Sequence, residues 1–239
     1  MICKINNLSV KLPSGRTLLE NVSYSIHKDD FIVVLGTNGS GKTTMLKAIS
    51  GSIKYTGHIV IGNSMEIKHT SASDISKYIG VITQNVADSL FMEFSLQQNF
   101  QMYAEAFSNG EQSLQDFVNL MQTINPKLEK LFHAKTSTLS GGERQCFLLA
   151  LNLFFKKNLL LLDEHTSALD PKTATEVMKI TAKKLQETQI TCIMTTHNLD
   201  DAIKYGNKLI AMQSGKIIKV FEKEEKYKLT KLKLLQYCY

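Results

Sequence analysis

A glycine-rich segment that directly follows an apolar run places the strongest constraint on how this chain can fold. Residues 36–44 read GTNGSGKTT, which matches the pattern G-x-x-x-x-G-K-[ST]. The apolar run FIVVL precedes it at 31–35 and predicts a strand that is buried on both faces. A helix is predicted from Lys42 to about Ser50. Strand, loop and helix in this order form the setting in which such loops bind phosphate groups.

Each part of this loop has a chemical reason. Glycines let the backbone turn tightly, so that its N–H groups can point inward at an anion. The Lys42 ammonium can reach the terminal phosphates of a nucleotide, and the Thr43 hydroxyl can bind Mg²⁺. Kinases, GTPases, helicases and transport motors share this kind of loop, so the motif predicts a ligand and leaves the reaction open.

Apolar segments alternate with helical patterns along most of the chain. Further strands are predicted near residues 3–10, 22–26, 57–62, 78–83, 159–162 and 190–195. Between about 86 and 155 helical periodicity replaces the strand patterns, so we expect an inserted helical lobe there. Strands that alternate with helices favour an α/β fold with a mostly parallel sheet, whose ligands lie beyond the carboxyl ends of the strands.

Composition argues against several classes of protein. A chain of 239 residues with 43% hydrophobic content suits one globular domain with an inserted lobe. The net charge of +6 is small and scattered, so we expect no nucleic-acid partner. The four cysteines form no C-x-x-C pair, which argues against a disulfide framework or a zinc site. No signal-peptide pattern and no run of roughly 18 apolar residues is present, so we expect a cytoplasmic protein that another subunit would hold at any membrane.

Two carboxylates follow the apolar run at 159–162, in the sequence LLLLDE. Asp163 suits the binding of Mg²⁺, directly or through water, and Glu164 suits orienting or deprotonating an attacking water. A strand that simply ends where charge meets solvent is the alternative, and the phosphate loop in the same chain favours the catalytic interpretation. Lys42 and Asp163 are 121 positions apart (163 − 42), which leaves room for a lobe-sized insertion.

The segment LSGGERQ at 139–145 predicts a helix start that can receive an anion. Ser140 can cap the helix, and Glu143 three residues later completes a capping box. Gly141 and Gly142 leave backbone N–H groups uncovered at the helix N-terminus, where an anion is favoured.

With these segments in this order, the chain resembles the ATP-binding subunits of ABC transporters over nearly its whole length. LSGGE is similar to the family signature, and GTNGSGKTT and LLLLDE are similar to its two nucleotide motifs. TSALD at 166–170 resembles the loop that crosses the interface between two subunits. Gln84 in VITQN resembles the glutamine that senses Mg²⁺ and the γ-phosphate, and His197 in TTHNLDDA resembles the switch histidine that contacts the γ-phosphate.

The resemblance implies a fold and a set of site residues. The fold would be an α/β P-loop NTPase (RecA-like) core with an N-terminal antiparallel β subdomain and an inserted helical subdomain. A single domain would span 1–239, with the core in 1–85 and 156–239 and the helical lobe with the signature in 86–155. Catalysis would fall to Glu164, His197 and Gln84, and Mg²⁺ would be bound by Thr43, Gln84 and Asp163. The residues that would bind ATP are Gly36, Asn38, Gly39, Ser40, Gly41, Lys42, Thr43, Thr44, Leu12, Ser140, Gly141, Gly142 and Asp170.

The resemblance also implies partners. In the family each ATP lies between the phosphate loop of one subunit and the signature of the other, so this chain implies a homodimer or a pair with a related chain. Such subunits lie on the inner face of the cell membrane and act with integral-membrane permease subunits, and uptake systems can include an extracytoplasmic substrate-binding protein.

We therefore expect an ATPase that drives transport of a small solute, with import favoured over export. The sequence DEHTSALDP is similar to that of a bacterial subgroup of uptake-system ATPases, some of them linked to aromatic amino acids. Two alternatives use the same motifs without a permease: a soluble ABC ATPase, such as an iron–sulfur assembly scaffold, and a DNA-repair or translation ATPase.

The chain departs from the family pattern at four places, one of which is Leu151, where the family usually has an arginine. Leu12 stands where an aromatic residue usually stacks on adenine, so we expect modest discrimination between ATP and GTP. His165 replaces a common proline, and a pH sensor, a partner contact and a tolerated loop variant are all open interpretations. The tail at 222–239 lacks the motifs of a regulatory domain and is predicted to be a charged helix on the surface.

A permease helix would need a groove on the helical lobe, near Gln84 and 86–105. The segment SLFMEFSL offers four apolar residues there that we expect to be exposed, although packing inside the lobe explains them equally well. These residues are Leu90, Phe91, Met92 and Phe94.

Overall fold

A computed structural model describes residues 1–107 and 113–237 of the chain. The chain divides into two compact units. The first comprises Met1–Gly80, Asn158–Glu164 and Gln189–Tyr239, and the second comprises Val81–Lys157 and His165–Thr188. We expected 165–188 in the core, but its helix groups with the second unit because it packs on another helix there. The division of the chain into domains stays a prediction.

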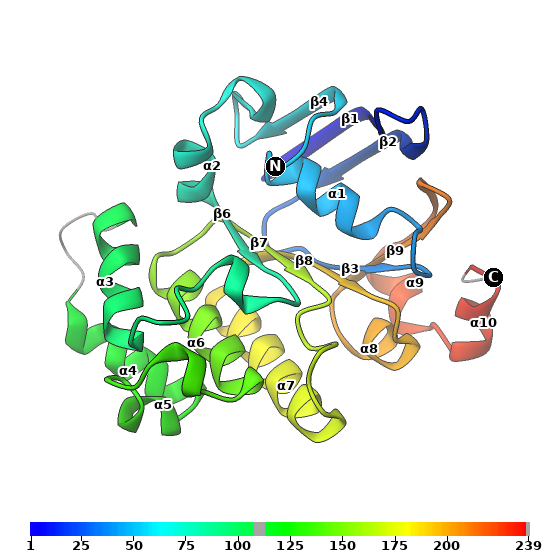
Figure 1. Cartoon of the computed structure of the whole chain (residues 1–239). Helices are drawn as coiled ribbons and strands as arrows, with labels where there is room; N and C mark the ends of the chain where they lie inside the picture. Colours follow the sequence, from blue (N-terminus) through cyan, green and yellow to red (C-terminus); the bar gives the residue numbers. More distant parts are fainter. Residues whose placement is uncertain (108–112, 238–239) are drawn as a thin grey trace. The chain divides into compact units, whose positions relative to one another are not determined.

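The first unit contains a four-stranded antiparallel sheet of order β2-β1-β4-β5 (Figure 1). Its strands are β1 (Cys3–Lys11), β2 (Thr17–Ile26), β4 (Thr56–Ile61) and β5 (Met65–Glu66). Along β1 buried residues alternate with more exposed ones, and the register shifts between Ile5 and Leu8, where Asn7 has φ 52°. The N-terminal antiparallel β subdomain is therefore confirmed.

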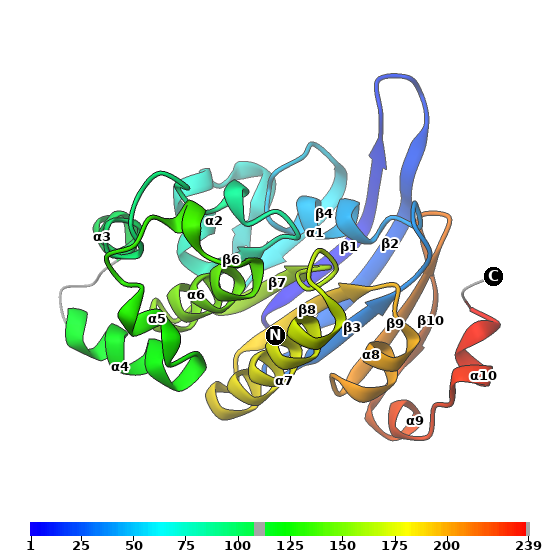
Figure 2. The same ribbon diagram turned by 60° about the horizontal axis from the view of Figure 1, so that its bottom comes forward.

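A second sheet has the order β10-β9-β3-β8-β7-β6, and Figure 2 shows β3, β8 and β7 side by side. Its strands are β3 (Phe31–Leu35), β6 (Ile79–Ile82), β7 (Leu159–Asp163), β8 (Thr191–Thr196), β9 (Lys208–Gln213) and β10 (Lys216–Phe221). The pairs β3–β8, β3–β9 and β7–β8 are parallel, and β9–β10 is antiparallel. This confirms the expected α/β fold with a mostly parallel sheet.

The central strands are apolar because both of their faces are covered. Ile32, Val33 and Val34 in β3 are 0% exposed, and all six residues of β8 are buried. The helices of the first unit are α1 (Lys42–Ile49), α2 (Ala72–Tyr78), α8 (Leu199–Lys204), α9 (Lys223–Tyr227) and α10 (Lys231–Leu235). The tail is thus two short helices where we predicted one, because the Thr230 side chain accepts the Lys233 N–H and starts a new helix. Residues 238–239 of the predicted tail lie outside the described residues.

The second unit is mostly helical, as expected. It contains α3 (Leu96–Phe107), α4 (Leu114–Ile124), α5 (Lys127–Lys130), α6 (Gly141–Phe154) and α7 (Pro171–Thr188), and short 3₁₀ turns at Val86–Asp88 and Thr136–Thr138. Phenylalanines from several helices form its core, and the rings of Phe100 and Phe117 stack with centroids 4.4 Å apart. Within the part of the chain that the structure describes, no helix is both long and apolar enough to cross a membrane.

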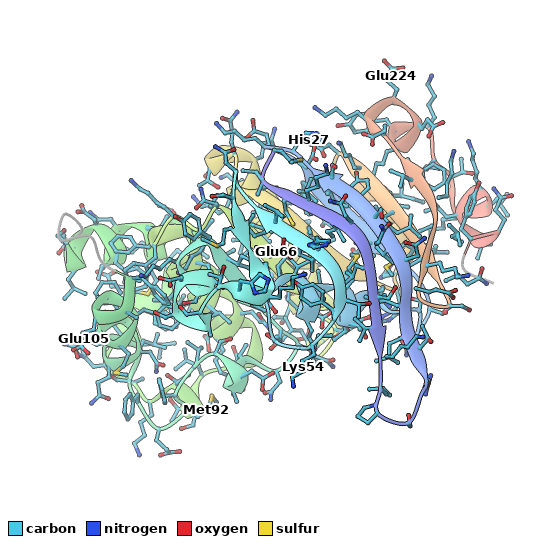
Figure 3. The ribbon with its side chains drawn as sticks, turned by 90° about the horizontal axis from the view of Figure 1, so that it is seen from above. His27, Lys54, Glu66, Met92, Glu105 and Glu224 are labelled. Atoms are coloured by element: carbon cyan, nitrogen blue, oxygen red, sulfur yellow. The ribbon has the colours of Figure 1, made fainter. Side chains whose placement is uncertain are left out.

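Of the four apolar residues at 90–94 that we expected to be exposed, Leu90 is buried. Leu90 is 4% exposed, because it ends the turn at Val86–Asp88 and its side chain joins the core. Phe91 and Phe94 are 53% and 37% exposed, and their rings stack with centroids 5.2 Å apart. Met92 is half-buried and lies at the outer edge of the unit in Figure 3.

Candidate nucleotide site

The loop between β3 and α1 can be formed only with its glycines. Gly39 and Gly41 have φ values of 82° and 104°, a region that side-chain-bearing residues rarely adopt. A Cβ on Gly36 would lie 2.5 Å from the carbonyl oxygen of Met212 on β9. The loop therefore favours glycine at 39 and 41 because of their backbone conformation, and at 36 because there is no space for a Cβ.

Lys42 links this loop to the acidic pair. Its ammonium is buried and donates to the carbonyls of Gly36, at 2.9 Å, and Thr37, at 3.2 Å. The same Nζ lies 3.3 Å from Glu164 Oε1. Ser40 Oγ is buried and has no hydrogen-bond partner among the described residues, so one hydroxyl of the loop is unused. An ammonium and an unused hydroxyl in a positive-φ loop fit a phosphate ligand.

Asp163 ends β7 beside the loop. Its Oδ1 accepts hydrogen bonds from Thr43 Oγ1, at 3.0 Å, and from Thr195 Oγ1, at 2.7 Å. A hydroxyl and a carboxylate oxygen are ligands that Mg²⁺ prefers, so Thr43 and Asp163 fit a shared magnesium ion.

Glu164 holds an unusual backbone conformation. Its φ is 45°, which is rare for a residue with a side chain, and its N–H donates to Thr195 Oγ1 at 3.1 Å. Its Oε2 lies 3.1 Å from Nδ1 of His197, which follows β8. The Lys42 ammonium, the Glu164 carboxylate and the His197 imidazole thus form one chain of contacts in the first unit.

Sequence analysis did not identify Thr195 as part of this site. Thr195 is opposite Asp163 in the parallel register of β7 and β8, and its hydroxyl holds both residues of the acidic pair in place. The one sequence signal was a polar residue within a buried strand, and only the strand register shows what it contacts.

The first unit contains three further candidates, for which the structure gives the burial. Thr44 is half-buried in α1, and Asn38 is exposed in the loop. Leu12 is 41% exposed at the turn between β1 and β2, where its N–H donates to the Arg16 carbonyl at 2.9 Å.

The second unit holds the other candidates, and its signature helix starts as predicted. Ser140 Oγ accepts the Glu143 N–H at 3.3 Å, and Glu143 Oε2 accepts the Ser140 N–H at 2.9 Å, so the capping box is confirmed. The two glycines also have a packing reason that the sequence did not reveal. A Cβ on Gly142 would lie 2.4 Å from Thr173 Cγ2 on α7, and one on Gly141 would lie 2.8 Å from Leu169 Cδ2.

A second side chain that sequence analysis missed connects the signature helix to the segment that contains Gln84. Gln145 on α6 is 3% exposed, and its Nε2 donates to the Thr83 carbonyl at 3.1 Å. Gln84 itself is exposed. The amide of Gln145 therefore fixes the backbone next to Gln84.

Asp170 begins α7. Its Oδ1 accepts the Thr173 N–H at 3.1 Å, and hydrogen bonds from the Thr173 side chain and backbone lower the pKa of Asp170. The carboxylate is exposed, so it is both a helix cap and an accessible anion.

Comparison with known proteins gives a consistent result. The sequence pattern of the family described as "ABC transporter" matches residues 19–167. The chain is 31% identical to the tyrosine transport ATP-binding protein of Clostridioides difficile, over 98% of this chain and 97% of that protein. It is 30% identical to the energy-coupling factor transporter ATP-binding protein EcfA of Pediococcus pentosaceus, over 97% of this chain and 84% of that protein.

Solved structures share the fold. The structure of cbiO1 from Clostridium perfringens, described as part of the ABC transporter complex cbiONQ, superimposes with a TM-score of 0.81 at 25% identity. That match covers 98% of this chain and 93% of the other. A dimeric bacterial ABC transporter cassette gives a TM-score of 0.78 at 24% identity, which supports the fold alone.

Proposed function

This chain belongs to the ABC transporter family as an ATP-binding, ATP-hydrolysing subunit, and we propose that it powers the import of a small solute, with tyrosine or a related amino acid as the first candidate. The contact chain Lys42–Glu164–His197 carries the catalytic part of this proposal. The candidate substrate rests on the relative named for tyrosine transport.

In the proposed reaction Glu164 orients the attacking water and accepts its proton. The carboxylate suits this role because it stands at the end of β7 and has the His197 imidazole at 3.1 Å. Lys42 binds the terminal phosphates, and His197 contacts the γ-phosphate while it holds Glu164. Backbone N–H groups of the 36–44 loop and the Ser40 hydroxyl bind the remaining phosphate oxygens.

Mg²⁺ would be held by Thr43 and Asp163, with Gln84 as the further ligand that the family resemblance implies. When bound, the ion neutralises charge that develops on the phosphate oxygens during transfer. Thr195 positions Asp163 for this role through the hydrogen bond at 2.7 Å.

We also propose that the active form is a homodimer. Ser140, Gly141 and Gly142 of one subunit would face the phosphate loop of the other, and Asp170 would lie at the subunit interface. Two ATP molecules would then join the subunits, and hydrolysis would separate them. The relatives whose names assign them to transporter systems support a role within a transporter complex.

The proposed location is the cytoplasmic face of the membrane, against permease subunits. The exposed pair Phe91 and Phe94, with Met102 at 42% exposure, is the proposed contact for a permease helix. Solute selection would lie in the permease and in any extracytoplasmic binding protein.

The catalytic proposal is tested with Glu164→Gln and Lys42→Ala. Glu164→Gln should keep ATP binding in equilibrium dialysis and lower hydrolysis by about a hundredfold or more, because it removes the base. Lys42→Ala should weaken ATP binding itself, because it removes a charge-assisted contact to phosphate. Glu20→Gln, an exposed glutamate on β2, serves as the control. Unchanged turnover in Glu164→Gln would rule out Glu164 as the base.

The transport proposal is tested by mild detergent extraction of the tagged protein from its native membranes. A stoichiometric multi-span protein should copurify, and cells that carry Glu164→Gln should take up less labelled tyrosine than wild-type cells. A protein without a membrane partner in several mild detergents would favour the soluble ABC ATPase.

Leu12 leads to a separate prediction about selectivity between adenine and guanine nucleotides. A half-exposed aliphatic side chain provides no aromatic stacking, so ATP and GTP should bind with affinities that differ by less than about a hundredfold. Competition binding measures this ratio, and Leu12→Tyr should tighten the binding of both nucleotides, because both bases can stack on an aromatic ring.

A further inference from the structure

The helix that follows His197 is too short to be stable by itself. α8 spans Leu199–Lys204, six residues, and isolated helices of that length do not persist in water. Its start is capped locally, because Asn198 Oδ1 accepts the Asp200 N–H at 2.8 Å and the Asp201 N–H at 3.4 Å. Because His197 immediately precedes this cap, whatever holds α8 also holds the backbone that carries the imidazole.

The C-terminal tail, residues 222–237, holds α8 at both ends. At the helix C-terminus the Lys226 ammonium donates to the Ile203 carbonyl, one of the carbonyls that a helix end leaves without a helical partner. Lys226 is 1% exposed, so this contact is shielded from water. At the helix N-terminus Lys231 Nζ lies 2.6 Å and 2.8 Å from the two carboxylate oxygens of Asp200.

Packing supports both contacts. α10 packs on α8, and Figures 1 and 2 both show these two helices next to each other. Leu234 in α10 is 0% exposed, whereas Glu224 at the other end of the tail points away from the ribbon in Figure 3. The tail thus has buried residues, Lys226 and Leu234, beside exposed ones.

We propose that the tail is a positioning element of the hydrolysis site: through Lys226 and Lys231 it fixes α8, and thereby holds the His197 imidazole against Glu164. The inference rests on the proposed catalytic role of the Glu164–His197 contact. Lys226 and Lys231 are positioning residues, because each would act on the site only through α8. The Asp200–Lys231 pair is largely exposed, so it guides the position of α8 more than it adds stability.

Lys231→Ala is the first variant, because it breaks the contact at Asp200 and leaves Lys226 in place. It should lower the kcat of ATP hydrolysis about three- to tenfold and leave the KM for ATP unchanged, since the phosphate loop keeps its contacts. Lys231→Arg should restore kcat, because a guanidinium can pair with both oxygens of Asp200. Lys233→Ala, which removes the same charge from the same helix, should have no effect. Lys226→Met should lower kcat further if the variant folds.

A second measurement does not depend on hydrolysis. The imidazole NMR signals of His197, assigned with His197→Gln, should shift in Lys231→Ala and stay in place in Lys233→Ala. If kcat and the His197 signals of Lys231→Ala both match those of the wild type while His197→Ala is inactive, the positioning role of the tail is refuted and the proposed function stands. If His197→Ala keeps wild-type turnover, the catalytic role of His197 fails, and so does the assignment of the tail to the hydrolysis site.

Discussion

At His165 the chain carries an imidazole that is 3% exposed, with its Nε2 3.5 Å from Thr181 Oγ1 on α7. Burial lowers the pKa of this histidine to about 4, so it is neutral in the folded protein near pH 7. A side chain buried within its own unit argues against the partner-contact interpretation of this departure from the family pattern. A pKa this low also argues against a pH sensor for the neutral range.

The pKa shift of His165 predicts a pH-dependent stability. In the unfolded chain a histidine binds a proton near pH 6.5, whereas the folded protein resists protonation until about pH 4. The free energy of unfolding should therefore fall as the pH drops from 6.5 to 4, by up to about 3 kcal/mol from this group. Urea unfolding at pH 7.5 and 4.5 measures the fall, and His165→Leu should show a smaller one. An equal fall in both chains would assign the effect to other groups.

At the scale of elements, the contact between α6 and α7 explains why residue 142 is a glycine. Because a Cβ there would lie 2.4 Å from Thr173 Cγ2, Gly142→Ala should destabilise the protein by about 1–3 kcal/mol. Thr173→Ser removes the obstructing methyl group and keeps the hydroxyl that bonds to Asp170. The double variant should therefore recover most of the loss in denaturant unfolding. Additive losses in the double variant would show that the two side chains do not compete for this space.

The elements also show what the sequence could and could not predict. Strands such as 31–35 and 159–162 were predictable because a buried strand of a parallel sheet is apolar along its whole length. The capping box at Ser140 was predictable because its two partners are three residues apart. The role of Thr195, the burial of Leu90 and the packing reason for Gly142 depend on segments that meet only in the folded chain. No local pattern carries that information.

At the scale of the whole molecule, the motifs divide into two sets that belong to different halves of each proposed site. In the proposed dimer Lys42 and Glu164 would act on the ATP bound by their own subunit, whereas Ser140 would act on the ATP bound by the partner. In a symmetric dimer each subunit contributes its phosphate loop to one site and its signature to the other. If one chain has a defective phosphate loop and its partner a defective signature, both defects fall in the same site. The other site is then intact.

A mixed dimer of Lys42→Ala and Ser140→Arg chains, coexpressed with different tags and purified on both, tests this arrangement. Each variant alone should be inactive, whereas the mixed dimer should hydrolyse ATP at about half the wild-type rate if the sites are independent, because one of two sites is intact. The matched control combines Lys42→Ala with Glu164→Gln. Both defects then lie in the same half of the site, so each site of that dimer is broken and activity should stay absent. Equal activities of the two mixed dimers would contradict a site shared between subunits, because only a shared site can distinguish the two combinations.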